Sequence, residues 1–362
     1  MIRSLKFPFY AKVSLIFMGL FVFVYMLDIG QHIIVPIIYS TIIAILLSPM
    51  VDFFVRKKIN RIVAIAITLA LVSLIIVSIL LLLATQLNEF GDAFPKLVDK
   101  FYDVLNRLIA WISENFNITT RKINTFITDT KTQMLNTSRS SIAITLSTIG
   151  DALVVVVLIP VYVFMILFYQ PLLLDFIRKV LGEQNQKEVN EVLSSTKNII
   201  QKYLIALLIE IGIVAILNSI GLLIIGIEYA IILGVLGAVL NLIPYLGGII
   251  AMTMYMIIAL ITKDSISSMF YVLILYSAIQ LIDNNFIVPK LVGSKVKINA
   301  LVSIIAVIVG GALWGIAGMF LSLPLVAIIK LIFDRIEPLK PWGFLLGDTM
   351  PAINLFKINL KK

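Results

Sequence analysis

The stretch Asn241-Leu-Ile-Pro244-Tyr245-Leu-Gly247-Gly248 interrupts an apolar run that extends from Tyr229 to Thr262. As one helix, this run would be about 51 Å long at 1.5 Å per residue. The hydrocarbon core of a bilayer is only about 30 Å thick. Because proline cannot continue the hydrogen-bond ladder and paired glycines permit a tight turn, the stretch predicts a re-entrant hairpin of two short helices. Such breaks line binding sites in membrane proteins.

A second apolar run, residues 300–333, is also too long for one span and contains Gly310-Gly311-Ala-Leu-Trp314-Gly315-Ile-Ala-Gly318. Small residues at this spacing allow helices to approach closely. Pro324 is predicted to break the returning arm. We therefore expect a second re-entrant hairpin, with Gly310, Gly311 and Gly315 near its tip.

Composition places the whole chain in one class. Of its 362 residues, 60% are hydrophobic and 14% are charged, which is far from a soluble domain. Further apolar runs lie at about 13–27, 33–51, 62–85, 142–169, 203–227 and 266–288. The sequence predicts an all-α polytopic membrane protein with about six transmembrane helices, two re-entrant helical hairpins and an amphipathic helical insert.

Residue counts exclude several kinds of site. The chain has no cysteine and one histidine, His32, so disulfides, iron–sulfur clusters and a zinc site are not expected. We predict no cofactor and no bound metal. The formal net charge is +9, but the basic residues lie between apolar runs, which indicates membrane topology and not a nucleic-acid partner.

Charge also predicts orientation. With a cytoplasmic N-terminus and two re-entrant hairpins, 21 of the 29 Lys and Arg residues fall on the cytoplasmic side, against 19 if both interrupted runs cross. The positive-inside rule favours the first arrangement. We expect both termini in the cytoplasm, a retained first span, and a bacterial cytoplasmic (inner) membrane location.

The predicted organisation has five parts. The stretch 86–141 is polar but repeats apolar residues every three or four positions, as an amphipathic helix does. It is expected on the extracytoplasmic side. The parts are N-terminal transmembrane helices (1–85), the amphipathic insert (86–141), a transmembrane helix with a cytoplasmic connector (142–202), a hairpin-bearing transport domain (203–337) and a cytoplasmic tail (338–362).

A polar stripe ends the run 266–288. Its members are Tyr276, Gln280, Asp283 and Asn284. Their spacing places them on one helical face. An ionisable group in lipid is costly, so the stripe is expected to face the protein interior. There it could coordinate a cation or hydrogen-bond a polyhydroxylated solute; alternatively, Asp283 is interfacial and caps nearby backbone.

Glu210 lies near the middle of an apolar run with no basic residue close in sequence. Burial favours the neutral form of a carboxyl group. Glu210 is therefore a candidate proton carrier. The alternative is a structural role, in which a neutral Glu210 is hydrogen-bonded to another helix.

The chain resembles the AI-2E family of bacterial membrane transporters, known for export of autoinducer-2. The resemblance covers nearly the whole chain and lies in 241–248, in Gln280-Leu-Ile-Asp283-Asn284-Asn285-Phe-Ile-Val-Pro289-Lys-Leu-Val-Gly293, and in 310–324. Two positions depart from the family pattern: Asp283 stands where Glu is common, and Asn299-Ala300 where His-Pro is frequent. The resemblance implies hairpins that contribute to the substrate site, a homo-pentamer, and an elevator-like motion.

The sequence is compatible with three functions. The first is secondary-active export of a small polar organic solute, with autoinducer-2 as a candidate. Its site residues are Asn241, Pro244, Tyr245, Gly247, Gly248, Tyr276, Gln280, Asp283, Asn284, Gly310, Gly311 and Gly315. The second is a sodium/proton antiporter in which Asp283 and Glu210 titrate, so that Na⁺ or H⁺ is the coupling ion. The third is a non-transporting scaffold that uses 86–141 to recruit partners. No nucleotide-binding loop or catalytic constellation stands out, so an enzyme is not expected.

Overall fold

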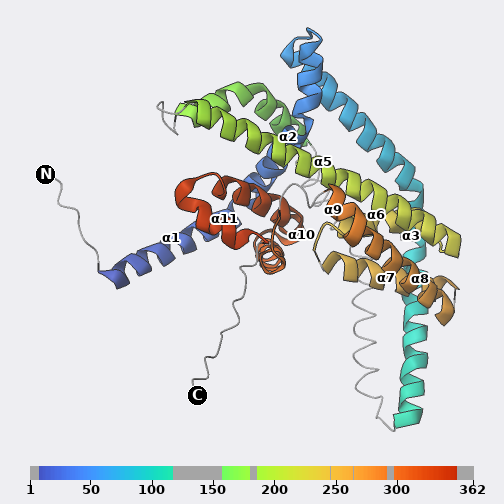
Figure 1. Ribbon diagram of the computed structural model, residues 1–362. Helices are drawn as coiled ribbons and strands as arrows, with labels where there is room; N and C mark the ends of the chain where they lie inside the picture. The colour runs from blue at the N-terminus through green and yellow to red at the C-terminus, as the bar shows by residue number, and fades with distance from the viewer. Residues whose placement is uncertain are drawn as a thin grey trace, which may run out of the picture.

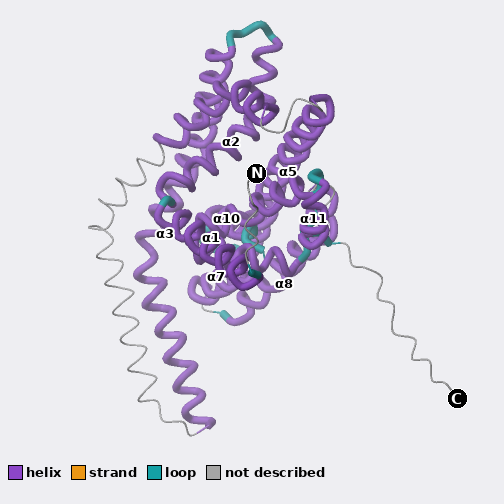
Figure 2. The backbone as a smooth tube through the Cα atoms, turned by 90° about the vertical axis from the view of Figure 1, so that its left-hand side faces the viewer, coloured by secondary structure: helices purple, strands orange, loops and turns teal. Residues whose placement is uncertain are grey.

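The computed structural model describes residues 8–116, 157–179, 186–244, 246–263, 265–291 and 297–348. Within these ranges the protein consists of helices and their connections, without strands, so the predicted all-α class is confirmed there (Figures 1 and 2). The elements are α1 (Phe9–Ile29), α2 (Gln31–Arg56), α3 (Arg61–Phe116), α5 (Gln186–Ile225), α6 (Ala230–Leu240), α7 (Leu246–Lys263), α8 (Ile266–Ile282), the π-helical turn η2 (Asp283–Ile287), α9 (Val288–Leu291), α10 (Ala300–Phe333), the 3₁₀ turn η3 (Glu337–Leu339) and α11 (Lys340–Leu346). An unlabelled helix, Val157–Lys179, lies between α3 and α5 in the chain.

Eight helices in the described ranges are long and apolar enough to cross a membrane. They are Phe9–Ile29, Gln31–Arg56, Arg61–Asp92, Val157–Lys179, Ser194–Ile225, Leu246–Lys263, Ile266–Leu291 and Ala300–Phe333. Little of their apolar surface is covered by protein, from 0% of α1 to 33% of α5 and α7 in the most apolar windows. Exposed apolar surface on this scale requires lipid around it. The protein is a multi-pass membrane protein.

The N-terminal helices pack with Val157–Lys179 around one cluster of buried apolar side chains: Ala44, Leu47, Val51, Ala64, Ile65, Val163 and Leu167. Arg61 Nη2 donates hydrogen bonds to the Leu167 carbonyl at 2.7 Å and to Gln170 Oε1 at 3.0 Å. The Ser40 hydroxyl donates to the Ile159 carbonyl at 3.3 Å. The apolar cluster and the Ser40 hydrogen bond hold α2 against Val157–Lys179, and α2 forms one wall of the cavity described below.

The first interrupted run forms α6 and α7, with the turn at residues 241–244 between them. The Tyr255 hydroxyl on α7 donates to the Leu233 carbonyl on α6 at 2.9 Å, so the two helices lie side by side. The turn needs glycine at position 247, because a Cβ there would collide with the Leu240 carbonyl oxygen. The sequence break therefore corresponds to a real helix–turn–helix.

The second interrupted run is a single helix by hydrogen-bond pattern, α10, but its backbone breaks at Trp314 (φ −134°) and Gly315 (φ +58°). Positive φ favours glycine. Cβ atoms built on Gly310 and Gly318 would each collide with the other's carbonyl oxygen. In a straight helix these residues would be about 12 Å apart, so the chain folds back on itself at 314–315.

Pro324 does not break the returning arm, contrary to prediction, because α10 remains helical from Ile316 to Phe333. Proline removes one N–H donor and can be tolerated in an apolar helix whose neighbours cover the freed group. Leu321 and Ala327, on either side, are each 1% exposed. The reversal depends instead on the Trp314–Gly315 break.

At the end of α8 the helix widens into η2, which begins at Asp283. Pro289, six residues later, has no N–H to donate to Asn285. The Asn285 side-chain amide donates to the Leu281 carbonyl at 2.8 Å. π-helical turns inside α-helices are frequent at functional sites, and this one begins at the buried Asp283.

The polar insert begins as part of α3, which runs without interruption through residue 86 to Phe116 and includes Pro95. Val98 and Tyr102 are buried there against Phe101, Leu105 and Ile109. Its first part still contacts the other helices, since Gln86 Oε1 accepts from the Ile232 N–H at 3.3 Å and Lys100 Nζ donates to the Ile261 carbonyl at 3.4 Å. The end of α3 at Phe116 projects beyond them (Figures 1 and 2). Residues 117–141 of the predicted insert lie outside the described residues.

The C-terminal helix α11 is attached to the start of α10 by Asn299. Its Oδ1 accepts from the Val302 N–H at 2.8 Å and caps α10. Its Nδ2 donates to the carbonyls of Leu345 at 2.7 Å and Gly347 at 3.1 Å. The chain just after α11 is thereby held beside α10.

Candidate functional site

A cavity of about 1070 Å³ lies between α2, α5, the 241–244 turn, α7, the α8–η2–α9 segment and α10. Eight of the residues predicted for the site line it: Glu210, Asn241, Pro244, Gly248, Tyr276, Gln280, Asp283 and Asn284. They come from three stretches that are separate in sequence: Glu210, 241–248 and 276–284. Pockets of about 300–1,000 Å³ hold organic ligands, so this cavity has room for a small organic molecule.

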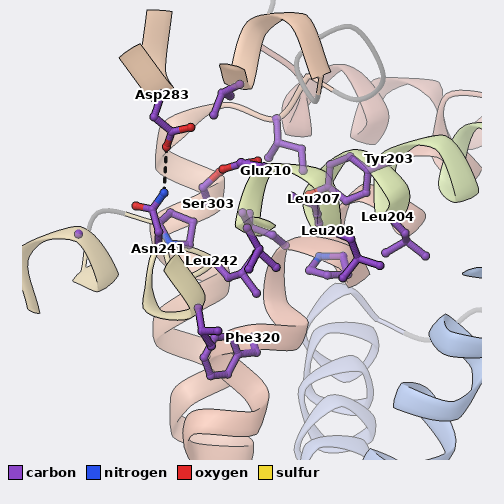
Figure 3. A pocket seen from close by; sticks show the side chains of 18 of the residues that line it. Tyr203, Leu204, Leu207, Leu208, Glu210, Asn241, Leu242, Asp283, Ser303 and Phe320 are labelled. Atoms are coloured by element: carbon purple, nitrogen blue, oxygen red, sulfur yellow. Dashed lines mark hydrogen bonds between the residues drawn. The ribbon is translucent and has the colours of Figure 1, made fainter. Parts of the chain in front are cut away.

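Asp283 is the most deeply buried polar group of the cavity, with 1% of its surface exposed. Its Oδ2 accepts a hydrogen bond of 2.9 Å from Asn241 Nδ2, which joins the α6–α7 turn to η2 (Figure 3). Its Oδ1 is also buried but has no hydrogen-bond partner among the described residues. A buried polar atom without a partner is costly, so Oδ1 is an available acceptor.

Glu210 projects into the same cavity from α5 and is 9% exposed. It lies within electrostatic range of Asp283 and of the Tyr203 hydroxyl. Neither carboxyl group forms an ion pair with another described residue. Two acidic groups on different helices therefore share one cavity without a basic partner.

Tyr276 and Gly248 both line the cavity and lie close to each other. A Cβ on Gly248 would be 3.1 Å from the Tyr276 hydroxyl. The Tyr276 ring meets that of Tyr255 edge to face, with centroids 5.8 Å apart. The glycine therefore leaves room for the tyrosine hydroxyl, which becomes part of the polar lining.

The other predicted residues lie elsewhere. Gly247 is in the turn, where it permits close backbone contact and does not line the cavity. Gly310 and Gly311 pack against the returning arm of α10, and Gly315 forms its tip. These glycines shape the two reversals, and Tyr245 lies outside the described residues.

The tip of α10 is held by two side chains. The Tyr39 hydroxyl on α2 donates to the Ala317 carbonyl at 3.0 Å. Trp314 Nε1 donates to the Leu27 carbonyl of α1 at 3.1 Å. The second reversal is therefore fastened to the N-terminal helices.

Sequence reasoning did not identify several lining residues. Tyr39, Tyr203 and Ser303 line the cavity, and each is a polar residue within an apolar run. That signal was present but is common in membrane helices. The apolar part of the lining, which includes Leu204, Leu207, Leu208, Leu242 and Phe320, carries no signal in the sequence, because every helix in the chain is rich in such residues.

The arrangement supports binding chemistry. Among the described residues, no group of three His, Cys, Asp or Glu side chains is close enough to hold a metal ion. The polar groups are acceptors and amides placed at helix breaks, which can recognise a solute by hydrogen bonds.

Comparisons with known proteins agree with the sequence resemblance. The model of the AI-2E family transporters matches residues 13–337 of this chain. The AI-2 transport protein TqsA of Escherichia coli K12 is 24% identical over 323 residues, 88% of this chain and 90% of that protein. YueF of Bacillus subtilis 168 is 23% identical over 334 residues, 90% of this chain and 88% of that protein. A Borreliella burgdorferi protein is 31% identical over 170 residues, 47% of each chain. With its polar cavity, its two helix reversals and a match over nearly its whole length, the chain belongs to the AI-2E family of transporters.

Proposed function

We propose that this protein is a secondary-active transporter that exports a small polar organic solute through the cavity between α2, α5, α8 and α10. The observation that carries the proposal is the unpartnered, buried Oδ1 of Asp283, at the junction of a helix break and a π-helical turn. A buried acceptor in a cavity of this size is a ready contact for a solute. The name of TqsA, AI-2 transport protein, makes autoinducer-2 the first candidate cargo.

The proposed mechanism is elevator-like. The α6–α7 and α10 reversals would each enter and leave the membrane on one side, and would move with α8 against α1, α2, α3 and Val157–Lys179. Both termini would lie in the cytoplasm of a bacterial cell, at its inner membrane. Five copies would assemble, each with its own cavity. The short arms on either side of each reversal support this arrangement.

Export can be measured in right-side-out vesicles that are loaded with labelled autoinducer-2. Asp283→Asn and Asn284→Ala should each slow the loss of label, because both residues line the cavity. Asn88→Ala is the matched control, because Asn88 is exposed on α3 and does not line the cavity. Export at the wild-type rate in both cavity variants would contradict the proposal.

A cation/proton antiporter is the second candidate, favoured by one specific observation. Glu210 and Asp283 are buried carboxyl groups in one cavity, within electrostatic range of each other. Such a pair takes up and releases protons as a unit, and a sodium ion could compete with the proton for its oxygens.

This candidate predicts a sodium-dependent pH change in everted vesicles. Glu210→Gln should abolish the change, whereas Glu228→Gln should not, because Glu228 is exposed and lies outside the cavity. A pH response that does not depend on sodium would exclude the antiporter.

A further inference from the structure

The charges that line the cavity are all of one sign. Its described lining contains three carboxyl groups, those of Glu210, Asp283 and Asp348, and no Lys, Arg or His. Asp348 is exposed, whereas the other two are buried. An anionic solute would meet only like charges there, without a basic side chain to offset the loss of its hydration.

The unpartnered Oδ1 of Asp283 restricts the chemistry of the solute more than the charge of the lining does. Asn241 supplies one donor, to Oδ2, and Oδ1 remains free among the described residues. A group that fills this position must donate a hydrogen bond. A charged donor makes the stronger bond to a carboxylate, and it also compensates the negative charge that burial makes costly.

The cavity has two ends of different character. Figure 3 shows Asp283, Asn241 and Ser303 together on one side, with Glu210 between them and the apolar side. The opposite side consists of Leu204, Leu207 and Leu208 on α5. Leu242 and Phe320 extend this apolar surface below the polar groups. A solute that fits both ends is amphipathic.

Aromatic rings border the acidic end. Tyr203 and Tyr276 line the cavity beside Glu210 and Asp283, respectively, within electrostatic range of them. The face of a tyrosine ring attracts a cation. Both tyrosines therefore lie where they could contact a positively charged group that binds beside Glu210 and Asp283.

We propose that the solute of this cavity is an amphipathic organic cation, with a protonated amine beside Asp283 Oδ1 and Glu210 and an apolar body against the α5 leucines. This inference rests on the proposed function, in which the cavity is the solute site. It narrows the cargo from any small polar molecule to one that carries positive charge, and so favours an amine over autoinducer-2, which has no basic group. The volume of about 1070 Å³ is far more than a bare inorganic ion fills.

Three probes of one size and different charge test the proposal: 2-phenylethylamine (a cation at pH 7), 2-phenylethanol (neutral) and phenylacetate (an anion). Binding of tritiated 2-phenylethylamine is measured on the full-length protein in liposomes, and the other two serve as competitors. The amine should bind about tenfold or more tightly than either competitor, as expected for a charge-assisted contact. Equal or tighter binding of phenylacetate or 2-phenylethanol, or no binding of the amine, would overturn the proposal.

Variants locate the binding. Asp283→Asn should weaken amine binding about tenfold and leave 2-phenylethanol binding unchanged. Glu210→Gln gives an independent test if Asp283→Asn does not fold, with weaker amine binding expected. Asp175→Asn is the matched control, because Asp175 is exposed, pairs with Lys179 and lies outside the cavity. Amine binding at wild-type strength in both cavity variants would overturn the proposal.

Different experimental results would refute this inference and the proposed function. If export of labelled autoinducer-2 requires Asp283 but the amine neither binds nor competes, the cavity is the solute site and the preference for cations is wrong. If neither export nor amine binding depends on Asp283 or Asn284, the cavity is not the site and both proposals are wrong.

Discussion

Among the residues that the structure describes, Asn241 is the one whose side chain donates a hydrogen bond to the Asp283 carboxyl group. The pair joins two segments that are 42 residues apart in sequence. Because Asp283 is 1% exposed, the loss of a donor from this carboxyl group is costly. This amide therefore adds a specific polar link between the α6–α7 turn and η2 to the apolar packing of α7 on α8.

Asn241→Ala should lower the free energy of unfolding by about 1–3 kcal/mol, because it leaves both oxygens of a buried carboxyl group without a donor. The measurement is a thermal or denaturant melt of the purified protein in detergent. Asp283→Asn is the comparison: its side-chain carbonyl can still accept from Asn241, so it should melt close to the wild type while it loses transport. An Asn241→Ala protein that melts like the wild type would show that the bond does not hold the turn.

At the scale of one element, α10 depends on how closely its two arms approach. The backbones of Gly310 and Gly318 are in contact, so no side chain fits between them. Gly318 is also near the Trp314 side chain. The reversal is therefore specified by glycines on both arms and by the positive φ at Gly315.

Gly318→Ala should destabilise the protein by about 1–3 kcal/mol, because overpacking forces the arms of α10 apart. Gly19→Ala is the matched control, since a Cβ on Gly19 of α1 meets nothing within 4 Å, and alanine is a better helix former than glycine by about 1 kcal/mol. Melts of the two variants should therefore shift in opposite directions. A shift in the same direction would mean that the close approach is not the cause.

The sequence predicts where helices begin and end better than it predicts which helices pack against each other. The break at Pro244–Gly248 and the stripe from Tyr276 to Asn284 follow from local chemistry, and both border the cavity. The fold-back of α10 was expected, but Pro324 was assigned a break that the helix does not have. Tyr39 could not be placed, because its bond to Ala317 spans 278 positions and such a contact leaves no local pattern.

At the scale of the whole molecule, two hydrogen bonds cross the boundary on which the proposed motion takes place. Tyr39 and Trp314 join the N-terminal helices to the tip of α10. If α10 moves against α1 and α2, both bonds must break in each cycle. They therefore stabilise the conformation seen in the structure relative to conformations in which α10 has moved away from α1 and α2.

Tyr39→Phe removes one of these bonds, which is worth about 0.5–1.5 kcal/mol. Local opening of the tip should become about two- to tenfold more frequent. Hydrogen exchange of the backbone amides at 312–318 measures this directly. Tyr271→Phe is the control, because Tyr271 is exposed on α8 and does not contact the tip. Unchanged exchange in Tyr39→Phe would mean that the hydroxyl does not hold α10.

Whether the two reversals re-enter one side of the membrane decides the arrangement of the whole chain. At 1.5 Å per residue, the arms of α10 before and after Trp314–Gly315 are about 21 and 27 Å long, and α6, with 11 residues, is shorter still. α7, with 18 residues, is about 27 Å long, so in each pair one arm approaches the thickness of a core of about 30 Å and the other is clearly too short to cross it. Each pair of arms is therefore expected to enter and leave on the same side, which places Lys263 outside the cell and Lys290 in the cytoplasm.

The chain contains no cysteine, so single cysteines can report this arrangement without background. Lys263→Cys should react with a membrane-impermeant maleimide in intact cells, and Lys290→Cys only after the membrane is opened. Arg56→Cys serves as a cytoplasmic reference in either topology, because the first interrupted run lies after it. If Lys263→Cys is protected and Lys290→Cys is labelled from outside, the α6–α7 run crosses the membrane. The turn at Asn241 would then be part of a continuous crossing. The proposed elevator mechanism would then lack the re-entrant hairpin that contributes Asn241, Pro244 and Gly248 to its site.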